Sequence, residues 1–342
     1  MLLEGFFCVV RSVLSVLGAA GNIINIDTFI SMGISDSMVV TMLFMAVFDL
    51  LHLIAMLSRA VSFVFYVVEN TRGFSMWFPV DPYGVYVFFG HAGRIPYTMV
   101  ALTTTYLAVT RCMCVARPLQ FKTTFTTRLS VIILSSLAIL SVATYVPILV
   151  YMAMLPGFDP KINATRPLLW ISPQRDFVKK IVWTIRDVVL PVATLFTVII
   201  CATVMSERLL ASTRFRQSHF HVAELAQHVH QSAEIPIIHT IAHPCERPTV
   251  KNTSGTTEIS VKLCAKDLRI VQQMILISVV FVVCNIPEMF VSFVSLLEPD
   301  FGLGRPYSNI YMTAISLEYF FRTVHSSCHI FIYYKYSAKY RR

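Results

Sequence analysis

Seven long runs of apolar residues follow one another along the chain and define its organisation. They cover roughly residues 7–30, 38–66, 83–110, 129–154, 181–205, 270–297 and 307–334. An α-helix needs about 20 apolar residues to cross the hydrocarbon core of a bilayer, and each run reaches that length. Glycine and proline inside the runs are compatible with helix, because neighbouring helices satisfy the freed backbone groups. The pattern predicts an all-α membrane protein, a single domain (residues 1–342) built as a seven-transmembrane helix bundle.

Isolated polar residues and prolines interrupt these runs at particular places. In chain order they are Asn22, Asp49, Thr110-Arg111-Cys112 at the end of the third run, Pro191, Pro287 and Tyr333-Tyr334. Ionisable groups inside a membrane span are costly, so they mark function by default. This combination is typical of a multi-pass membrane receptor.

The composition agrees with a membrane protein and gives it an orientation. The chain is 56% hydrophobic and 14% charged, with a mean hydropathy of +0.66, whereas soluble domains are about 25% charged. The net charge of +9 does not indicate nucleic-acid binding, because the basic residues lie mostly in loops between the runs. With the N-terminus outside, about sixteen of them are cytoplasmic and about seven are outside. We therefore expect a plasma-membrane protein with a cytoplasmic C-terminus.

The segments outside the runs carry three further expectations. Residues 206–266 form the third cytoplasmic loop, a flexible insert in which histidines at 219, 221, 228 and 230 have the spacing of metal-binding tracts. A mobile polar loop is the favoured interpretation, because no small fold surrounds these histidines. Residues 335–342 are expected to form a short amphipathic helix. The sequon Asn163-Ala164-Thr165 lies in an outer loop and is a candidate glycosylation site.

Two alternatives concern the N-terminus and the cysteines. Residues 1–20 could be a signal peptide, since they end in small residues, but the apolar run continues to Ile30 and cleavage would leave six spans. Of the eight cysteines, Cys8 alone lies near the outer face. We therefore expect no extracellular disulfide.

The ordered landmarks resemble those of the rhodopsin-like family of G-protein-coupled receptors over nearly the whole chain. The motifs that carry the resemblance are Gly21-Asn22, Met45 to Leu50, Thr110-Arg111-Cys112, Arg117-Pro118-Leu119, Pro191, Phe281, Cys284-Asn285-Ile286-Pro287 and Ser326 to Tyr333. The chain departs from the family where His329-Ile330 replaces Asn-Pro, Asn285 replaces a tryptophan and Thr110 replaces an acid. The cysteine usual at the outer end of the third span is missing near Tyr86. Such divergence is similar to the invertebrate chemosensory-type and peptide-receptor-like expansions of this family.

The resemblance implies roles for three groups of residues. Arg111, beside Thr110, would be held at rest by an acid on the sixth span, here Asp267, and would turn toward the G protein on activation; the alternative is that Arg111 only snorkels to the headgroups. The activation switch would comprise Phe281, Asn285, Pro287, Pro191 and Tyr333. The polar core would comprise Asn22, Asp49, His325, Ser326 and His329, with a sodium ion at Asp49.

Spacing in the seventh run adds a prediction about this polar core. Glu318, Arg322, His325, His329 and Tyr333 recur every three or four residues and so share one helical face. We hypothesise that His329 takes part of the sodium ion's role against Asp49 and makes activation sensitive to pH. A neutral histidine with satisfied hydrogen bonds is the alternative.

Charged residues in the outer halves of the runs are candidates for the ligand site. They are Arg59, Arg94, Arg186, Asp187, Glu288, Glu318 and Arg322, and the alternative is that they pair among themselves. A pocket of mixed sign suits a zwitterion or a peptide terminus. Gly93 stands where amine receptors have their acid, and Thr323 stands near the retinal lysine of opsins, so neither class is expected.

The sequence therefore predicts a receptor that binds an extracellular peptide or polar small molecule and activates a heterotrimeric G protein. Its expected partners are this G protein, the ligand and the lipid bilayer, without nucleic acid, metal or enzymatic chemistry. A transporter or channel for a small polar solute is the alternative, although the chain has no internal repeat of the kind many transporters show.

Overall fold

The fold is described from a computed structural model of the chain. It describes residues 2–342 except 72–77, 118–120, 122–123, 161, 173–181, 183, 209, 211–253, 299, 303–304, 337–339 and 341–342. The side chains of residues 2–3, 254–268 and 270 also lie outside the description.

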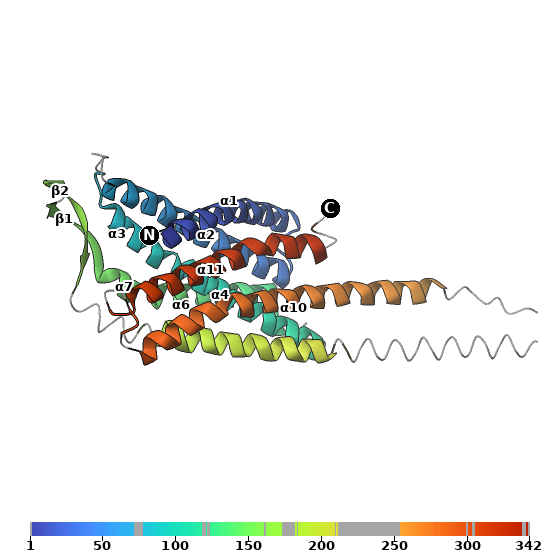
Figure 1. The fold of residues 1–342 in the computed structure, drawn as a ribbon. Helices are drawn as coiled ribbons and strands as arrows, with labels where there is room; N and C mark the ends of the chain where they lie inside the picture. Colours follow the sequence, from blue (N-terminus) through green and yellow to red (C-terminus); the bar gives the residue numbers. More distant parts are fainter. Residues whose placement is uncertain are drawn as a thin grey trace, which may run out of the picture.

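The described chain is mostly helical, with one β-hairpin (Figure 1). Its helices are α1 (Leu2–Ser31), α2 (Ser37–Asn70), α3 (Pro82–Ala92), α4 (Arg94–Ala116), α6 (Thr127–Ala143), α7 (Val146–Val150), the π-helix η1 (Thr184–Val189), α10 (Ser254–Leu297) and α11 (Ser308–Tyr336). The helical segment that begins with η1 continues to Arg208. The strands are β1 (Met152–Asp159) and β2 (Ala164–Ile171).

The long helices run side by side in one bundle, with α11 packed against α1, α2 and α10 (Figure 1). The β-hairpin lies at the same end of the bundle as the start of α1, and α11 finishes at the opposite end. We call these two ends the hairpin end and the loop end. The loop end is the one where α10 projects beyond its neighbours (Figure 1).

Helix length and composition make this a multi-pass membrane protein. Among the described residues, six helical segments are long and apolar enough to cross a membrane: Glu4–Ser31, Ser37–Asn70, Pro82–Ala116, Thr127–Val150, Thr184–Arg208 and Val271–Leu297. The seventh expected span corresponds to α11, which is 29 residues long but is not among the six. Its hydropathy is lowered by the polar face that carries Glu318, Arg322, His325 and His329.

Local sequence explains where several helices begin. The carboxylates of Asp36 and Asp81 accept backbone N–H bonds in the first turns of α2 and α3, and the Thr126 hydroxyl does so for α6. These side chains satisfy donors that a helix start leaves free. Just beyond the C-terminal end of α1, Gly33 adopts φ = 87°, a left-handed conformation that glycine accepts without strain.

The predicted fourth run, 129–154, extends too far. Helix α6 ends at Ala143, a short α7 follows, and the last residues of the predicted run, Met152 to Met154, belong to β1. Pro147 explains the break, because its ring clashes with the carbonyl four residues earlier and it donates no hydrogen bond. The two antiparallel strands, which the sequence did not predict, pair Met152 with Ile171 and Asp159 with Ala164.

An arginine fixes the hairpin to the bundle. Arg166 of β2 forms ion pairs with Asp159 (2.5 Å) and with Glu69 of α2 (2.7 Å), and also donates to the Phe78 carbonyl. Burial alone would lower the pKa of Arg166, but its hydrogen bonds to Asp159 and Glu69 raise that pKa above the ordinary value. The hairpin therefore has a fixed position over this end of the bundle.

Two other predicted boundaries change. Residues 254–266, expected in the flexible insert 206–266, are already helical and continue into the sixth span as α10. At 1.5 Å per residue this 44-residue helix is about 66 Å long, roughly twice the hydrocarbon thickness. Residues 211–253, including the histidine pairs, lie outside the described residues. Of the expected helix 335–342, Lys335 and Tyr336 belong to α11, and most of the remainder also lies outside the described residues.

Candidate functional site

A chain of buried ion pairs crosses the bundle toward the hairpin end. Arg94 of α4 contacts Asp187 of η1 at 2.9 Å and Glu318 of α11 at 3.2 Å. Arg322 contacts Glu318 at 2.7 Å and also pairs with Glu288 of α10. Arg322 is only 1% exposed. Five of the predicted ligand-site residues therefore pair among themselves, which was the alternative considered from the sequence.

Arg59 of α2 is buried differently. Its guanidinium carbon lies 4.3 Å from the centre of the Tyr86 ring and 4.0 Å from that of Tyr319. Its Nη2 donates to the Tyr86 hydroxyl, while Nε and Nη1 have no hydrogen-bond partner among the described residues. Arginine on an aromatic face is stabilised by cation–π attraction. Arg59 is thus held by rings rather than by a carboxylate.

A cavity of about 250 Å³ opens beside these residues. It is lined by Arg59, Tyr83, Tyr86, Val87, Gly90, His91, Arg94, Tyr145, Ile148, Leu169, Ile171, Asp187, Tyr311, Met312, Ile315 and Tyr319. The lining combines apolar and aromatic side chains with a few charged groups, which is the usual make-up of a small-molecule site. Strand β2 supplies Leu169 and Ile171, so the hairpin forms part of the wall.

Several participants were missed by the sequence reasoning. Glu4 of α1 accepts from Arg11 (3.2 Å), from the Tyr86 hydroxyl (3.1 Å) and from Ser316. Arg186, by contrast, was among the predicted ligand-site residues; its guanidinium carbon lies 3.9 Å from the centre of the Tyr145 ring, and its Nη2 donates to Thr98. A charged residue inside an apolar run was the available signal for Glu4 and Arg11, whereas the tyrosines resemble ordinary core residues in the sequence.

The middle of the bundle contains the predicted polar core. Asp49 is 0% exposed, and His329 Nδ1 donates to its Oδ2 at 2.8 Å. The Asn22 side chain donates to the Ser326 carbonyl at 2.8 Å and so joins α1 to α11. His325 is equally buried and stacks edge-on to His329, with ring centres 4.9 Å apart.

This arrangement supplies only part of the site that the resemblance implies for a sodium ion. A sodium ion binds oxygen lone pairs; Oδ1 of Asp49 has no hydrogen-bond partner among the described residues, whereas Oδ2 accepts the His329 N–H. The Asn22 amide likewise presents its N–H group to Ser326. Among the described residues, no group of three or more histidine, cysteine, aspartate or glutamate side chains could hold a metal ion.

The residues predicted as an activation switch lie next to this core. Tyr97 of α4 donates to Asn285 Oδ1 at 3.0 Å, and the Asn285 amide donates to the Phe281 carbonyl within α10. The Phe281 ring packs edge-on against the His325 ring, with the ring centres 5.7 Å apart. The remaining residues of this group are placed as follows: Pro287 lies inside α10, Pro191 lies in the helical segment after η1, and Tyr333 is buried beside His329.

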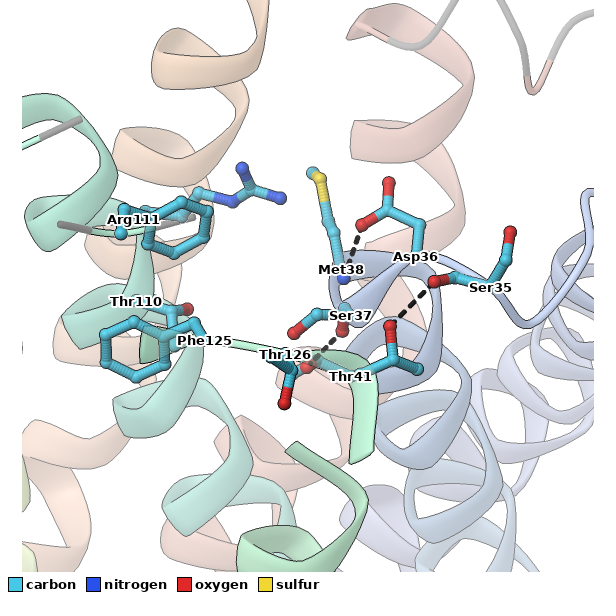
Figure 2. Close-up of a pocket in the computed structure, with 11 residues that line it drawn as sticks. Ser35, Asp36, Ser37, Met38, Thr41, Thr110, Arg111, Phe125 and Thr126 are labelled. Carbon is cyan, nitrogen blue, oxygen red and sulfur yellow. Dashed lines mark hydrogen bonds between the residues drawn. The ribbon is translucent and has the colours of Figure 1, made fainter. Parts of the chain in front are cut away.

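A second cavity, of about 620 Å³, lies at the loop end (Figure 2). Arg111 and Thr110 of α4 lie on one side of it, and Asp36 and Ser37 at the start of α2 lie on the other (Figure 2). Thr110 is buried and its hydroxyl donates to the Leu107 carbonyl. Asp267 belongs to α10, but its side chain lies outside the described residues, so its pairing with Arg111 stays a prediction.

The sequon is accessible at the hairpin end. Asn163 is exposed at the turn between β1 and β2, where it adopts φ = 52°, and Thr165 is exposed near the start of β2.

No protein-family model matches the chain, and a search of curated proteins finds no relative. The resemblance to rhodopsin-like receptors therefore rests on the motifs themselves.

Proposed function

We propose that this protein is a seven-helix receptor of the plasma membrane that binds a ligand at the hairpin end and activates a heterotrimeric G protein at the loop end. The observation that carries the proposal is that α4 connects two cavities at opposite ends of one bundle. Arg94 lines the cavity near the hairpin, and Arg111 lines the cavity at the loop end. The two arginines are seventeen positions apart in α4, which corresponds to a rise of about 25 Å along the helix.

Between the cavities, buried polar groups supply a physical means of coupling. The α11 face carries Glu318 and Arg322 near the first cavity and His329, paired with Asp49, nearer the second. Buried polar pairs have few alternative partners. Helices joined by such pairs therefore switch between a few distinct packing arrangements and do not deform continuously. A ligand that stabilises one packing would shift the population toward it. The protein performs no chemistry in this scheme.

The test measures the rate of nucleotide exchange on purified heterotrimeric G proteins of each major class in the presence of membranes that contain this protein. Exchange is measured alone and with a library of peptides and small polar metabolites. We expect exchange above that of control membranes, and we expect Arg111→Ala to abolish it. Arg128→Ala is the matched control, because Arg128 is an exposed arginine outside this cavity, near the start of α6.

The same preparation separates the receptor from the transporter alternative. Vesicles containing the protein are loaded with library members, and solute efflux is followed without G protein. Specific efflux, together with no exchange on any G-protein class, would overturn the proposal and favour a transporter.

A further inference from the structure

The buried charges at the hairpin end do not balance. The groups linked by ion pairs or by shared contact with Tyr86, Tyr145 and Tyr319 are the arginines 11, 59, 94, 186 and 322 and the carboxylates Glu4, Asp187, Glu288 and Glu318. Five positive charges against four negative charges leave one positive charge in excess. We call these nine residues the outer ion cluster.

The excess charge can be assigned to Arg59. Arg11 pairs with Glu4, Arg94 with Asp187 and Glu318, and Arg322 with Glu288 and Glu318. Arg186 is 4.0 Å from Asp187; like Arg59 it has two N–H groups without a hydrogen-bond partner among the described residues, but it does not line the cavity. Among the described residues, no carboxylate oxygen lies within 4.0 Å of an Arg59 nitrogen, and two N–H groups of Arg59 have no hydrogen-bond partner.

Glu4 is the nearest candidate for an internal counterion, but its oxygens are already used. Its Oε1 accepts from Arg11 and from Tyr86, and its Oε2 accepts from Ser316. The Tyr86 hydroxyl therefore separates Arg59 from Glu4, because it accepts from the arginine and donates to the carboxylate. Burial of an incompletely paired guanidinium is costly. Cation–π contact with the Tyr86 and Tyr319 rings offsets only part of that cost.

We propose that the cavity at the hairpin end binds small carboxylate ligands, with Arg59 as the residue that pairs with the carboxylate. The proposal rests on the receptor function proposed above and names the ligand class of that site. Arg59 is 6% exposed and lines the cavity, so an anion entering there meets an arginine without a carboxylate partner. Asp187 also lines the cavity, but its charge is already neutralised by Arg94. The site therefore favours an anion over a cation.

The remaining lining restricts the rest of the ligand. Tyr86 and Tyr319 contact Arg59, and the lining also includes Tyr83, Tyr145 and Tyr311 and the aliphatic residues Ile148, Leu169 and Ile171. A volume of about 250 Å³ lies just below the usual range for drug-sized ligands. A carboxylate attached to a small aromatic or aliphatic body fits this volume and lining better than a long peptide.

The test measures binding to the purified full-length protein in lipid nanodiscs without G protein. Matched pairs of an acid and its neutral amide are compared by isothermal titration: acetate and acetamide, benzoate and benzamide, 3-phenylpropionate and 3-phenylpropionamide. We expect the aromatic acids to bind and their amides to bind at least about 10-fold more weakly, as the loss of a charge-assisted contact implies. Equal binding of acids and amides, or no binding of any acid, would overturn the proposal.

Two substitutions assign the effect to Arg59. Arg59→Gln should lower acid affinity by about 10- to 100-fold, whereas Arg59→Lys, which keeps the charge, should retain part of it. Arg305→Gln removes an exposed arginine outside the cavity and should leave the affinity unchanged. A cooperative thermal transition for each variant shows that it is folded. Acid affinity that persists in a folded Arg59→Gln variant would contradict the assignment.

The two proposals can fail separately. Acid binding that depends on Arg59, without nucleotide exchange on any G protein, would retain the ligand class and reject the receptor. Exchange evoked by a cationic or neutral library member, without acid binding, would retain the receptor and reject the ligand class.

Discussion

At the scale of single residues, Arg322 concentrates the cost of burying charge. It is 1% exposed and pairs with two carboxylates on different helices. Replacing it with Met leaves Glu318 and Glu288 with less compensation, and breaking a buried pair costs about 3–5 kcal/mol. We expect Arg322→Met to lower the free energy of unfolding by about that amount, measured by denaturation in detergent micelles. Arg305→Met, at an exposed position, should change it by less than about 0.5 kcal/mol.

His329 provides a second prediction at this scale. Because its ring donates to Asp49 Oδ2, the natural protein should have the same thermal midpoint in sodium chloride as in choline chloride. His329→Asn removes the imidazole from Asp49 and should introduce a rise in midpoint that is specific to sodium. The same variant tests the predicted sensitivity of nucleotide exchange to pH. Identical sodium and pH responses in both proteins would reject a role for His329 in place of the ion.

At the scale of elements, the contact between α1 and α11 depends on a glycine. A Cβ atom on Gly18 would lie 2.7 Å from Ser327 Cβ and 3.0 Å from Leu53 Cδ1, so the helices approach too closely for a side chain. We expect Gly18→Val to lower the free energy of unfolding by about 1–3 kcal/mol through overpacking. Gly5→Val is the matched control on the same helix, because nothing lies within 4 Å of the corresponding Cβ. Equal effects of the two substitutions would contradict this account.

The hairpin gives a second prediction for an element. Arg166→Gln removes the ion pairs to Asp159 and Glu69 that fix β2 to α2. Hydrogen exchange followed by mass spectrometry should then show amides of residues 152–171 exchanging at least about 10-fold faster, because local opening costs less. Thr165→Ser, at an exposed position of the same strand, keeps the sequon and should leave exchange unchanged. Unchanged exchange in Arg166→Gln would mean that the strand pairing alone holds the hairpin.

The sequence predicted elements better than contacts, for physical reasons. Apolar runs must match bilayer thickness, so the boundaries of α2 and α11 lie within a few residues of those predicted. Met152 to Met154 were predicted as helix because they continue an apolar run, and hydropathy does not register the break at Pro147. Charged residues are rare in such runs and therefore stood out as site candidates. Which residue each of them pairs with could not be predicted, because pairing between helices depends on how the helices pack, and the hydropathy pattern of a single chain does not specify that packing.

At the scale of the whole molecule, the structure places the start of α1 and the finish of α11 at opposite ends of the bundle (Figure 1). This arrangement and the proposed receptor function together require the hairpin end to face outward. The exposed sequon at the turn between β1 and β2 should then carry a glycan. Treatment with a glycosidase should increase the gel mobility of the natural protein and should not change the gel mobility of the Asn163→Gln variant. Thr165→Ala, which also destroys the sequon, should behave like Asn163→Gln.

The same topology can be tested at the chain ends without the glycan. An epitope tag before Met1 should bind antibody on intact cells, whereas a tag after Arg342 should bind only after permeabilisation. The expectation follows from the proposed odd number of crossings, in which α11 is the seventh span. Burial of Glu318, Arg322 and His329 against neighbouring helices would make such a span compatible with lipid, because these polar side chains are paired inside the bundle. Both tags on one face would leave an even number of crossings and would remove α11, or another helix, from the membrane.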